Sequence, residues 1–278
     1  MQVILIRYAT ERLMYRLSLS KYGGRFVLKG AWLFYVWGIQ RRTTRDVDLL
    51  AMTDNKAEGV RRLFTEVIGT VVPVDDGLVF DTESLQVEEM QLDAEYTGLR
   101  LRLRALLGDI KIPTQVDLGF SEAVVEEPMP VALPVLLDFE APELKAYSPE
   151  VVVAEKLEAI VKLGTATTRF KDFFDLFLLS TEKTFDGQRL ARQVTATLTH
   201  RGTPIPGDIP AALGDAFASD PESQRQWRAF LRRSEVSEAP ERLTDAVARV
   251  RELVSPVLRA ASQGKEIPGT WTPGGAWG

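Results

Sequence analysis

The residues best suited to chemistry are three aspartates in predicted strands. Asp46 and Asp48 alternate with apolar residues in segment 46–50, and Asp117 lies in the apolar segment 114–118. Two carboxylates two residues apart on a strand point to the same face, so the first two can share one divalent cation. Taken alone, such a pair is more often an acidic strand surface, and Asp117 has the alternative role of a turn cap.

A glycine turn precedes the aspartate pair in the chain. The segment Phe26-Val27-Leu28-Lys29-Gly30 predicts a short strand that stops at the glycine, followed by an aromatic-rich helix from Ala31 to Trp37. Backbone N–H groups at the start of a helix are suited to binding phosphate. The turn therefore predicts a phosphate contact beside the carboxylates.

A lysine on a later predicted helix has an unusual setting. The residues three and four positions from Lys156 are all apolar: Val152, Val153, Ala159 and Ile160. Two readings stay open, a lysine that snorkels to solvent along apolar surface and a lysine that reaches a phosphate. In the next segment, Asp172 is a further candidate. Asp175 is spaced to pair with Lys171, which would make it structural.

The composition removes several classes of mechanism. The chain has no cysteine, which excludes disulfides, Cys-based zinc sites, iron–sulfur clusters and thiol nucleophiles. Its one histidine, His200, excludes a zinc-binding His pair, and no nucleophile elbow lies near it to form a Ser-His-Asp triad. Carboxylates, lysines, arginines and hydroxyls remain, which favours a metal held by oxygen ligands.

Hydropathy predicts a protein of the cytoplasm. The longest apolar stretch, 30–39, is well short of the ~18–20 residues that cross a bilayer. The first residues lack the basic start and long apolar core of a signal peptide. We therefore expect no membrane association.

Charge is distributed unevenly along this chain of net charge -5. Residues 1–45 hold nine Lys or Arg and one acid, Glu11, whereas Val71–Leu99 holds eight acids and no base. A basic segment on an acidic protein can hold phosphates. The alternative is an amphipathic helix over Tyr8–Leu19 with Arg12 and Arg16 on its outer, solvated face.

The length of 278 residues suits two domains of ordinary size. We predict an α+β protein with two lobes, in which residues 1–145 form a mixed sheet with helices and 146–278 form a helical domain. Strands are expected around Val71, Leu78, 86–92, 99–107 and 114–118. In 99–104 leucines and arginines alternate, which places three arginines on one face, either solvated or facing RNA.

Five helices and two irregular segments are expected in the rest of the chain. The helices are predicted at 149–163, 170–180, 188–199, 224–233 and 239–261. Ser148 provides a capping hydroxyl for the first of them. Prolines between 128 and 149 indicate an irregular connection, and the Gly/Pro-rich residues 262–278 indicate a frayed end.

The ordered set of motifs resembles the AbiEii/AbiGii nucleotidyltransferase toxins, which include the MenA-type toxins and belong to the DNA polymerase β-like superfamily. The resemblance spans about residues 20–180. The segments that carry it are Leu28-Lys29-Gly30-Ala31, Arg45-Asp46-Val47-Asp48-Leu49, Gln115-Val116-Asp117-Leu118-Gly119-Phe120, Val153-Ala154-Glu155-Lys156-Leu157-Glu158 and Arg169-Phe170-Lys171-Asp172-Phe173-Phe174-Asp175-Leu176. Where relatives often have Gly-Ser or Gly-Gly, this chain has Gly30-Ala31, so a serine contact to phosphate is absent.

The resemblance implies a two-lobed enzyme that uses Mg²⁺ and a nucleoside triphosphate. Asp46, Asp48 and Asp117 would be catalytic metal ligands, and Asp172 would fill the last catalytic motif. The nucleotide would be bound by Lys29, Gly30, Ala31, Arg45, Lys156 and Asp175. Relatives are toxins paired with a separately encoded antitoxin, and some transfer nucleotides to the acceptor end of tRNA. Phosphoryl chemistry needs positioning and charge neutralisation, so it can proceed without His or Cys.

Three functions are therefore open on the sequence. The first is a toxin that transfers a nucleotide to the 3′ end of an RNA, with tRNA as the expected acceptor. The second is an enzyme that modifies a hydroxyl of a small molecule or a protein. The third is a non-catalytic nucleotide-binding or partner-binding protein. The three carboxylates argue against this third function, and Ala31 argues slightly for it.

Overall fold

The chain divides into two compact units. The computed structural model describes residues 1–91, 97–120, 127–236, 238–265, 267 and 269–278. The first unit is built from residues 1–120 and Pro128–Tyr147, and the second mainly from Ser148 onward. Within the described residues, no helix is long and apolar enough to cross a membrane. Leu92, the expected end of one strand, lies outside the described residues.

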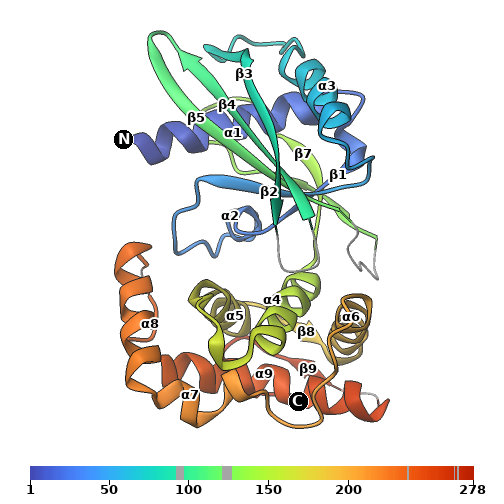
Figure 1. Ribbon diagram of the computed structural model, residues 1–278, viewed down its shortest axis with the longest axis vertical. Helices are drawn as coiled ribbons and strands as arrows, with labels where there is room; N and C mark the ends of the chain where they lie inside the picture. The colour runs from blue at the N-terminus through green and yellow to red at the C-terminus, as the bar shows by residue number, and fades with distance from the viewer. Residues whose placement is uncertain (92–96, 121–126, 237, 266, 268) are drawn as a thin grey trace. The chain divides into compact units, whose positions relative to one another are not determined.

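The first unit is organised around a mixed sheet of seven strands in the order β3-β4-β5-β2-β1-β7-β6. The strands are β1 (Phe26–Lys29), β2 (Asp46–Ala51), β3 (Leu78–Gln91), β4 (Thr97–Leu107), β5 (Ile110–Gly119), β6 (Met129–Ala132) and β7 (Glu143–Ala146). Strand β2 is parallel to β5 and antiparallel to β1, and β1 is parallel to β7. Pairing within the β3-β4-β5 ribbon is antiparallel (Figure 1). The mixed α+β class expected from the sequence is confirmed.

Helices cover the apolar side of this sheet. They are α1 (Gln2–Leu19), α2 (Trp32–Val36) and α3 (Ala57–Ile68), with a 3-10 turn at Gly23–Arg25. Helices α1 and α3 pack against each other and against the sheet. The alternation in β4 is confirmed, because Leu99, Leu101 and Leu103 are buried in the core while the arginines between them lie on the other face. Burial of these leucines removes apolar surface from water and stabilises the unit.

The second unit is helical, as expected. Its helices are α4 (Pro149–Leu163), α5 (Phe170–Glu182), α6 (Gly187–His200), α7 (Asp215–Ser219), α8 (Pro221–Arg233) and α9 (Leu243–Gln263), with 3-10 turns at Gly164–Ala166 and Ala211–Leu213. Helices α5 and α6 each pack against both α4 and α9 (Figure 1). A small two-stranded sheet joins β8 (Phe185–Asp186) to β9 (Thr270–Trp271). Helix α4 begins as predicted, but the Ser148 hydroxyl forms no capping hydrogen bond.

Three expectations from the sequence are wrong, one about a strand and two about irregular segments. Val71 is not in a strand, because it lies in a loop with its side chain 88% exposed. The proline-rich connection contains β6 and β7, which pair with each other at the edge of the sheet. The C-terminal end is packed rather than frayed: Trp271 is fully buried and its indole Nε1 donates to the Ser180 carbonyl at 2.9 Å. A buried aromatic ring with a satisfied N–H anchors such a segment despite its glycines.

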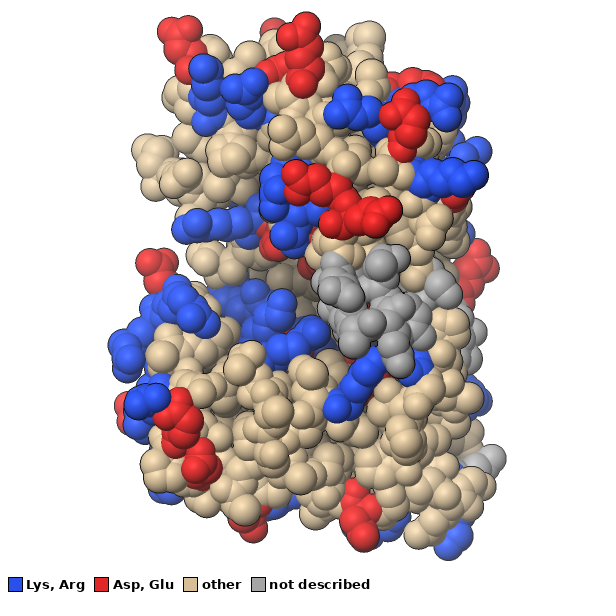
Figure 2. Space-filling view, viewed as in Figure 1, with Lys and Arg blue, Asp and Glu red and all other residues tan. Residues whose placement is uncertain are grey.

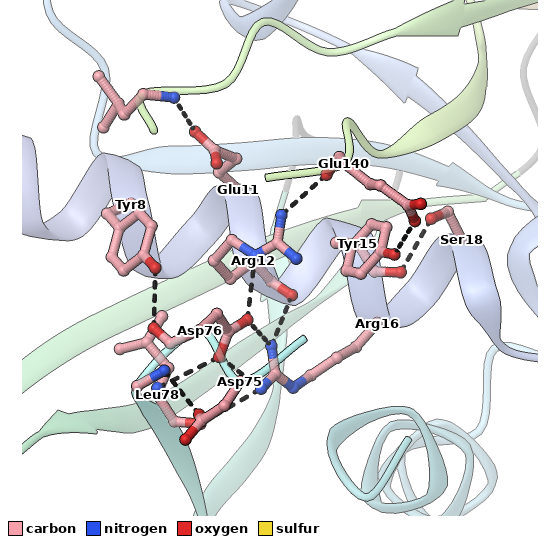
Figure 3. A network of polar contacts seen from close by, with 12 residues as sticks. Tyr8, Glu11, Arg12, Tyr15, Arg16, Ser18, Asp75, Asp76, Leu78 and Glu140 are labelled. Carbon is pink, nitrogen blue, oxygen red and sulfur yellow. Dashed lines mark hydrogen bonds and ion pairs between the residues drawn. The ribbon is translucent and has the colours of Figure 1, made fainter. Parts of the chain in front are cut away.

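Arg12 and Arg16 are buried, so their expected position on an outer face is wrong. Their exposed fractions are 1% and 5%, and both pair with Asp76 in the loop before β3. The Arg16 guanidinium donates to both carboxylate oxygens of Asp76 at 2.7 and 3.0 Å, and Arg12 Nε donates at 3.0 Å (Figure 3). Arg12 also donates to the Glu140 carbonyl at 2.9 Å. Helix α1 is enclosed on several sides, so its arginines meet protein rather than water.

The balance of forces on Asp76 sets its ionisation. Burial by itself raises the pKa of Asp76, but the hydrogen bonds from Arg16 and Arg12 outweigh it and hold the pKa below its ordinary value of 3.8. Glu11 lies on the same helix without such a partner, and burial raises its pKa although the Leu136 N–H donates to it. The buried arginines therefore need Asp76 as an anion.

Replacing Asp76 by Asn is expected to lower the free energy of unfolding by about 3 kcal/mol or more at neutral pH. The change leaves two buried guanidinium groups without a negative charge, and an uncompensated buried charge is strongly destabilising. Chemical denaturation followed by circular dichroism measures the loss. Asp75→Asn is the matched control, because Asp75 is adjacent and exposed; a surface change of this kind costs under about 0.5 kcal/mol.

The pH dependence of the stability difference between wild type and Asp76→Asn tests the ionisation of Asp76. Because the folded-state pKa is lowered, the stabilisation is present above the unfolded value of about 3.9 and is lost as pH falls through the folded pKa. The difference in unfolding free energy between wild type and Asp76→Asn therefore narrows as the pH drops below about 4. A difference that stays constant with pH would contradict the ion pairing.

Candidate functional site

Strand register in the first unit brings the predicted carboxylates into one row. Asp48 on β2 lies opposite Asp117 on the parallel strand β5, and Asp117 lies opposite Arg100 on β4. On the other side of β2, Lys29 at the end of β1 lies opposite Asp48. Directly opposed residues share one face of a sheet. Four charged side chains from four strands thus occupy neighbouring positions, and Asp46 lies on the same face two residues from Asp48.

Asp117 is held by an arginine that the sequence analysis did not select. Arg100 Nε donates to Asp117 Oδ1 at 2.8 Å, and its terminal NH2 group donates to Oδ2 at 2.6 Å. The Gln115 side chain adds a bond to Oδ1 at 3.1 Å. Two parallel bonds from a guanidinium to a carboxylate are strong and directional. This pairing, with Asp117 buried, sets the orientation of that carboxylate and rules out a simple turn cap.

Arg100 also responds to the other two aspartates of the site. The hydrogen bonds to Asp117 raise the pKa of Arg100, and the carboxylates of Asp46 and Asp48 raise it further. The guanidinium therefore neutralises part of the repulsion between these acids. The alternating pattern of β4 already placed Arg100 on a charged face, but only the pairing of β4 with β5 shows that it reaches Asp117.

The other two strand arginines also pair with acids. Arg102 contacts Glu88 at 2.7 Å, and Arg104 contacts Asp81 at 3.0 Å. Both pairs are largely exposed to solvent, where ion pairs contribute little to stability. Each of the three arginines of β4 thus pairs with an acid of β3 or β5, and Arg102 and Arg104 also remain in contact with solvent.

Gly30 is required by its contact with Asp48. Its φ of +68° lies in the left-handed region, which favours glycine. A Cβ added there would overlap the Asp48 carboxylate, lying 2.7 Å from Cγ and 2.9 Å from Cβ. The Asp48 side chain thus rests directly on the glycine backbone. The turn and one carboxylate of the row form a single close-packed unit.

The segments around Asp46 hold its backbone as well as its side chain. Trp32 Nε1 donates to the Asp46 carbonyl at 3.0 Å, and the Thr44 hydroxyl donates to Asp46 Oδ1 at 3.0 Å. Ala31 precedes α2, and Arg45 is exposed beside β2. Helix α2 has five residues, Trp32–Val36, and is shorter than the helix from Ala31 to Trp37 that the sequence predicted. So short a helix has little dipole with which to attract a phosphate.

The geometry bears on how a metal ion would be held. Among the described residues, no group of three or more acidic or histidine side chains is arranged to hold one. Asp46 and Asp48 share a face, whereas both oxygens of Asp117 accept from Arg100. A site of two carboxylates suits Mg²⁺, which is often bound by one or two carboxylates together with substrate phosphates. The three-carboxylate metal site stays a prediction.

The second unit contains a separate charged cluster. Lys156 Nζ on α4 lies 3.0 Å from Asp172 Oδ1 and 2.6 Å from Asp175 Oδ2, both on α5. Arg169 Nε lies 2.6 Å from Asp172 Oδ2. Both aspartates are buried, and the Lys156 side chain is 13% exposed. Lys156 and the more exposed Arg169 compensate the charges of the two buried aspartates.

Lys156 therefore does not snorkel to solvent, because it forms ion pairs with two aspartates. Its partners come from the following helix, which spacing along α4 alone does not reveal. A snorkelling lysine contributes modest packing, whereas Lys156 lies between two buried carboxylates. The contacts therefore predict a loss of stability when the ammonium group is removed.

A sequence comparison identifies the family. The family profile described as "Nucleotidyl transferase AbiEii toxin, Type IV TA system" matches residues 12–249. The chain belongs to the AbiEii family. As an AbiEii nucleotidyltransferase, it is an enzyme of toxin type, and the family implies a nucleoside triphosphate substrate and a cognate antitoxin. No relative among curated protein sequences matches this AbiEii chain.

Solved structures share the AbiEii fold of this chain. A Helicobacter pylori protein described as a "putative nucleotidyltransferase" is 14% identical, with a TM-score of 0.53 over 95% of this chain and 97% of its own. JHP933 from Helicobacter pylori is 13% identical, with the same TM-score over 95% of this chain and 94% of its own. At such identities the likeness concerns the fold alone.

Gly30→Ala is expected to destabilise the first unit by about 2 kcal/mol or more. The added Cβ makes the positive φ of this position strained and also overlaps Asp48. Gly38→Ala is a matched control, because Gly38 has a φ of +70° and nothing within 4 Å of the added Cβ. Thermal and chemical unfolding compare the two. Equal losses would show that the Asp48 contact contributes nothing.

Lys156→Ala is expected to cost about 3–5 kcal/mol of stability, because it removes the ammonium group that bonds two buried carboxylates and leaves Arg169 to pair with Asp172 alone. Lys162→Ala on the exposed side of the same helix is the control and should change stability by under about 0.5 kcal/mol. A double-mutant cycle with Asp175→Asn should show a coupling of about 1–3 kcal/mol. A coupling near zero would contradict the pairing.

Proposed function

We propose that this AbiEii enzyme transfers a nucleoside monophosphate from a nucleoside triphosphate to the 3′ end of an RNA, with the acceptor stem of tRNA as its substrate. One observation carries the proposal: the row of Asp48, Asp117 and Arg100 beside Gly30, in a chain whose family transfers nucleotides. Carboxylates and a glycine turn are the parts that phosphoryl chemistry requires when His and Cys are absent.

Asp46 and Asp48 are the proposed ligands of Mg²⁺. The donor set fits, because two carboxylates from one strand face leave room for phosphate oxygens as the remaining ligands. When bound, the ion would neutralise charge on the phosphates and support attack by the 3′-hydroxyl. Asp117 is proposed as the third, catalytic carboxylate. Its part in metal binding depends on whether Arg100 releases it.

The remaining site residues are proposed to bind the nucleotide. Lys29 lies opposite Asp48 and Arg45 directly precedes Asp46, so both bring positive charge near these carboxylates, and the backbone at Gly30-Ala31 offers N–H groups to a phosphate. In the second unit, Lys156 with Asp175 is proposed to contact the triphosphate, and Asp172 is the proposed catalytic residue of the last motif. Asp172 also orients Lys156 and Arg169, as its hydrogen bonds to both support.

The acceptor is proposed to be RNA because of the basic loop before β2. Arg41, Arg42 and Arg45 lie a few residues from Asp46 in the chain, and Arg45 is exposed. Arg12 and Arg16 are removed from this role, since both are buried against Asp76. Phosphate contacts of this kind make affinity fall with salt, by a log–log slope of about -0.7 per contact on single strands. Such an enzyme would act in the cytoplasm, where tRNA and nucleotides are found.

Incubating the protein with Mg²⁺, each labelled nucleoside triphosphate and total tRNA is expected to place label at tRNA 3′ ends. Asp46→Asn should reduce transfer at least 100-fold, because it removes a proposed metal ligand. Asp54→Asn is the control, since Asp54 is exposed on the loop after β2. Mn²⁺ binding followed by electron paramagnetic resonance measures the loss of metal binding, and circular dichroism checks that the variant is folded. Label on small molecules or protein instead of RNA would favour modification of another hydroxyl, and no transfer at all would favour a non-catalytic binding protein.

A further inference from the structure

Helix α8 of the second unit presents a row of arginines to solvent. Arg225, Arg228, Arg232 and Arg233 are all exposed, and the segment has one acid, Glu222. The first three follow one another at three and four positions, so they lie along one side of the helix. Figure 2 shows basic side chains gathered over the part of the second unit that Figure 1 labels α8.

Most of this row lacks a compensating charge. Arg225 pairs with Glu222 at 2.5 Å, but among the residues that the structure describes none forms an ion pair with Arg228, Arg232 or Arg233. Like charges four positions apart on a helix destabilise it. The helix dipole favours the two arginines of the last turn, yet Arg228 lies before that turn and gains nothing from it. On a protein of net charge -5, a row of uncompensated cations is suited to bind an external anion.

The exposed side of α8 carries no large apolar anchor. The aromatic residues of the helix, Trp227 and Phe230, are buried, and the Trp227 indole donates to the Pro240 carbonyl at 3.0 Å. A helix that lies on a membrane needs its apolar face free for lipid, and the core of a protein interface is enriched in aromatic residues. Because the aromatic residues of α8 are buried, its exposed side suits neither a membrane nor the core of a protein interface. A surface of arginines alone matches a chain of phosphates, which is bound through charge without base contacts.

We propose that the arginine face of α8, formed by Arg225, Arg228, Arg232 and Arg233, binds the phosphate backbone of the RNA acceptor. The inference rests on the proposed function, because that function supplies an RNA as the partner. It adds a second basic surface to the loop at 41–45. Its role is to raise affinity for RNA of any sequence, since phosphates carry no base identity.

The test compares two double variants of equal charge change. Arg228→Gln with Arg232→Gln removes two arginines of the α8 face, and Arg61→Gln with Arg62→Gln removes two exposed arginines of α3 that also lack acid partners among the described residues. Fluorescence anisotropy with labelled tRNA, in the absence of nucleotide and metal, is measured over a series of salt concentrations. We expect the α8 variant to bind about tenfold more weakly, with the magnitude of the salt slope lower by about 1.4 to 1.8. The α3 variant should bind like wild type.

A charge-preserving variant completes the test. Arg228→Lys with Arg232→Lys should retain most of the affinity, because a lysine also binds phosphate as a point charge. Unfolding curves check that all variants fold. Equal binding of the α8 and α3 variants would overturn the inference, as would α8-dependent binding to anionic vesicles with none to RNA. The proposed function is tested apart from this by nucleotide transfer in the wild type, so wild-type protein that binds RNA through α8 but transfers no label would contradict the function and leave the surface in place.

Discussion

The site in the first unit depends on the register between β2 and its neighbours. Because β2 and β5 run parallel with Asp48 opposite Asp117, and β5 pairs with β4 so that Asp117 meets Arg100, acids and cation meet on one face. A slip of one residue would send each side chain to the opposite face. The buried leucines of β4 prevent that slip, since they would be exposed to water. The apolar core therefore positions the charged row.

Three buried aspartates in this protein are each matched by a cation from another element. Asp76 meets Arg16 and Arg12 of α1, Asp117 meets Arg100 of β4, and Asp172 meets Lys156 of α4. Each pair links two different helices, strands or loops, so the cations fix tertiary positions as well as charge. An acid buried without such a partner would shift its pKa upward, as Glu11 does.

The arrangement suits phosphoryl transfer in a protein with one histidine. Such transfer asks for charge stabilisation and alignment of the reacting groups. Carboxylates that hold a metal and cations that hold phosphates would supply that stabilisation, and the chain belongs to a family of nucleotidyltransferases. Arginine recurs because its planar group both bonds a carboxylate in parallel, as in Arg100, and binds phosphate on an exposed helix, as proposed for α8.

Local patterns in the sequence were enough to indicate the α+β class, the alternating faces of β4 and the order of motifs that marks the AbiEii family. They could not show where charged side chains find their partners, because pairing depends on contacts between segments far apart in the chain. Arg12 and Arg16 have the helical spacing of a solvated face, yet the loop at Asp76 covers them. Lys156 has no acid on its own helix, and its two partners come from α5. Burial of a charge requires an opposite charge, and only the tertiary structure decides which residue provides it.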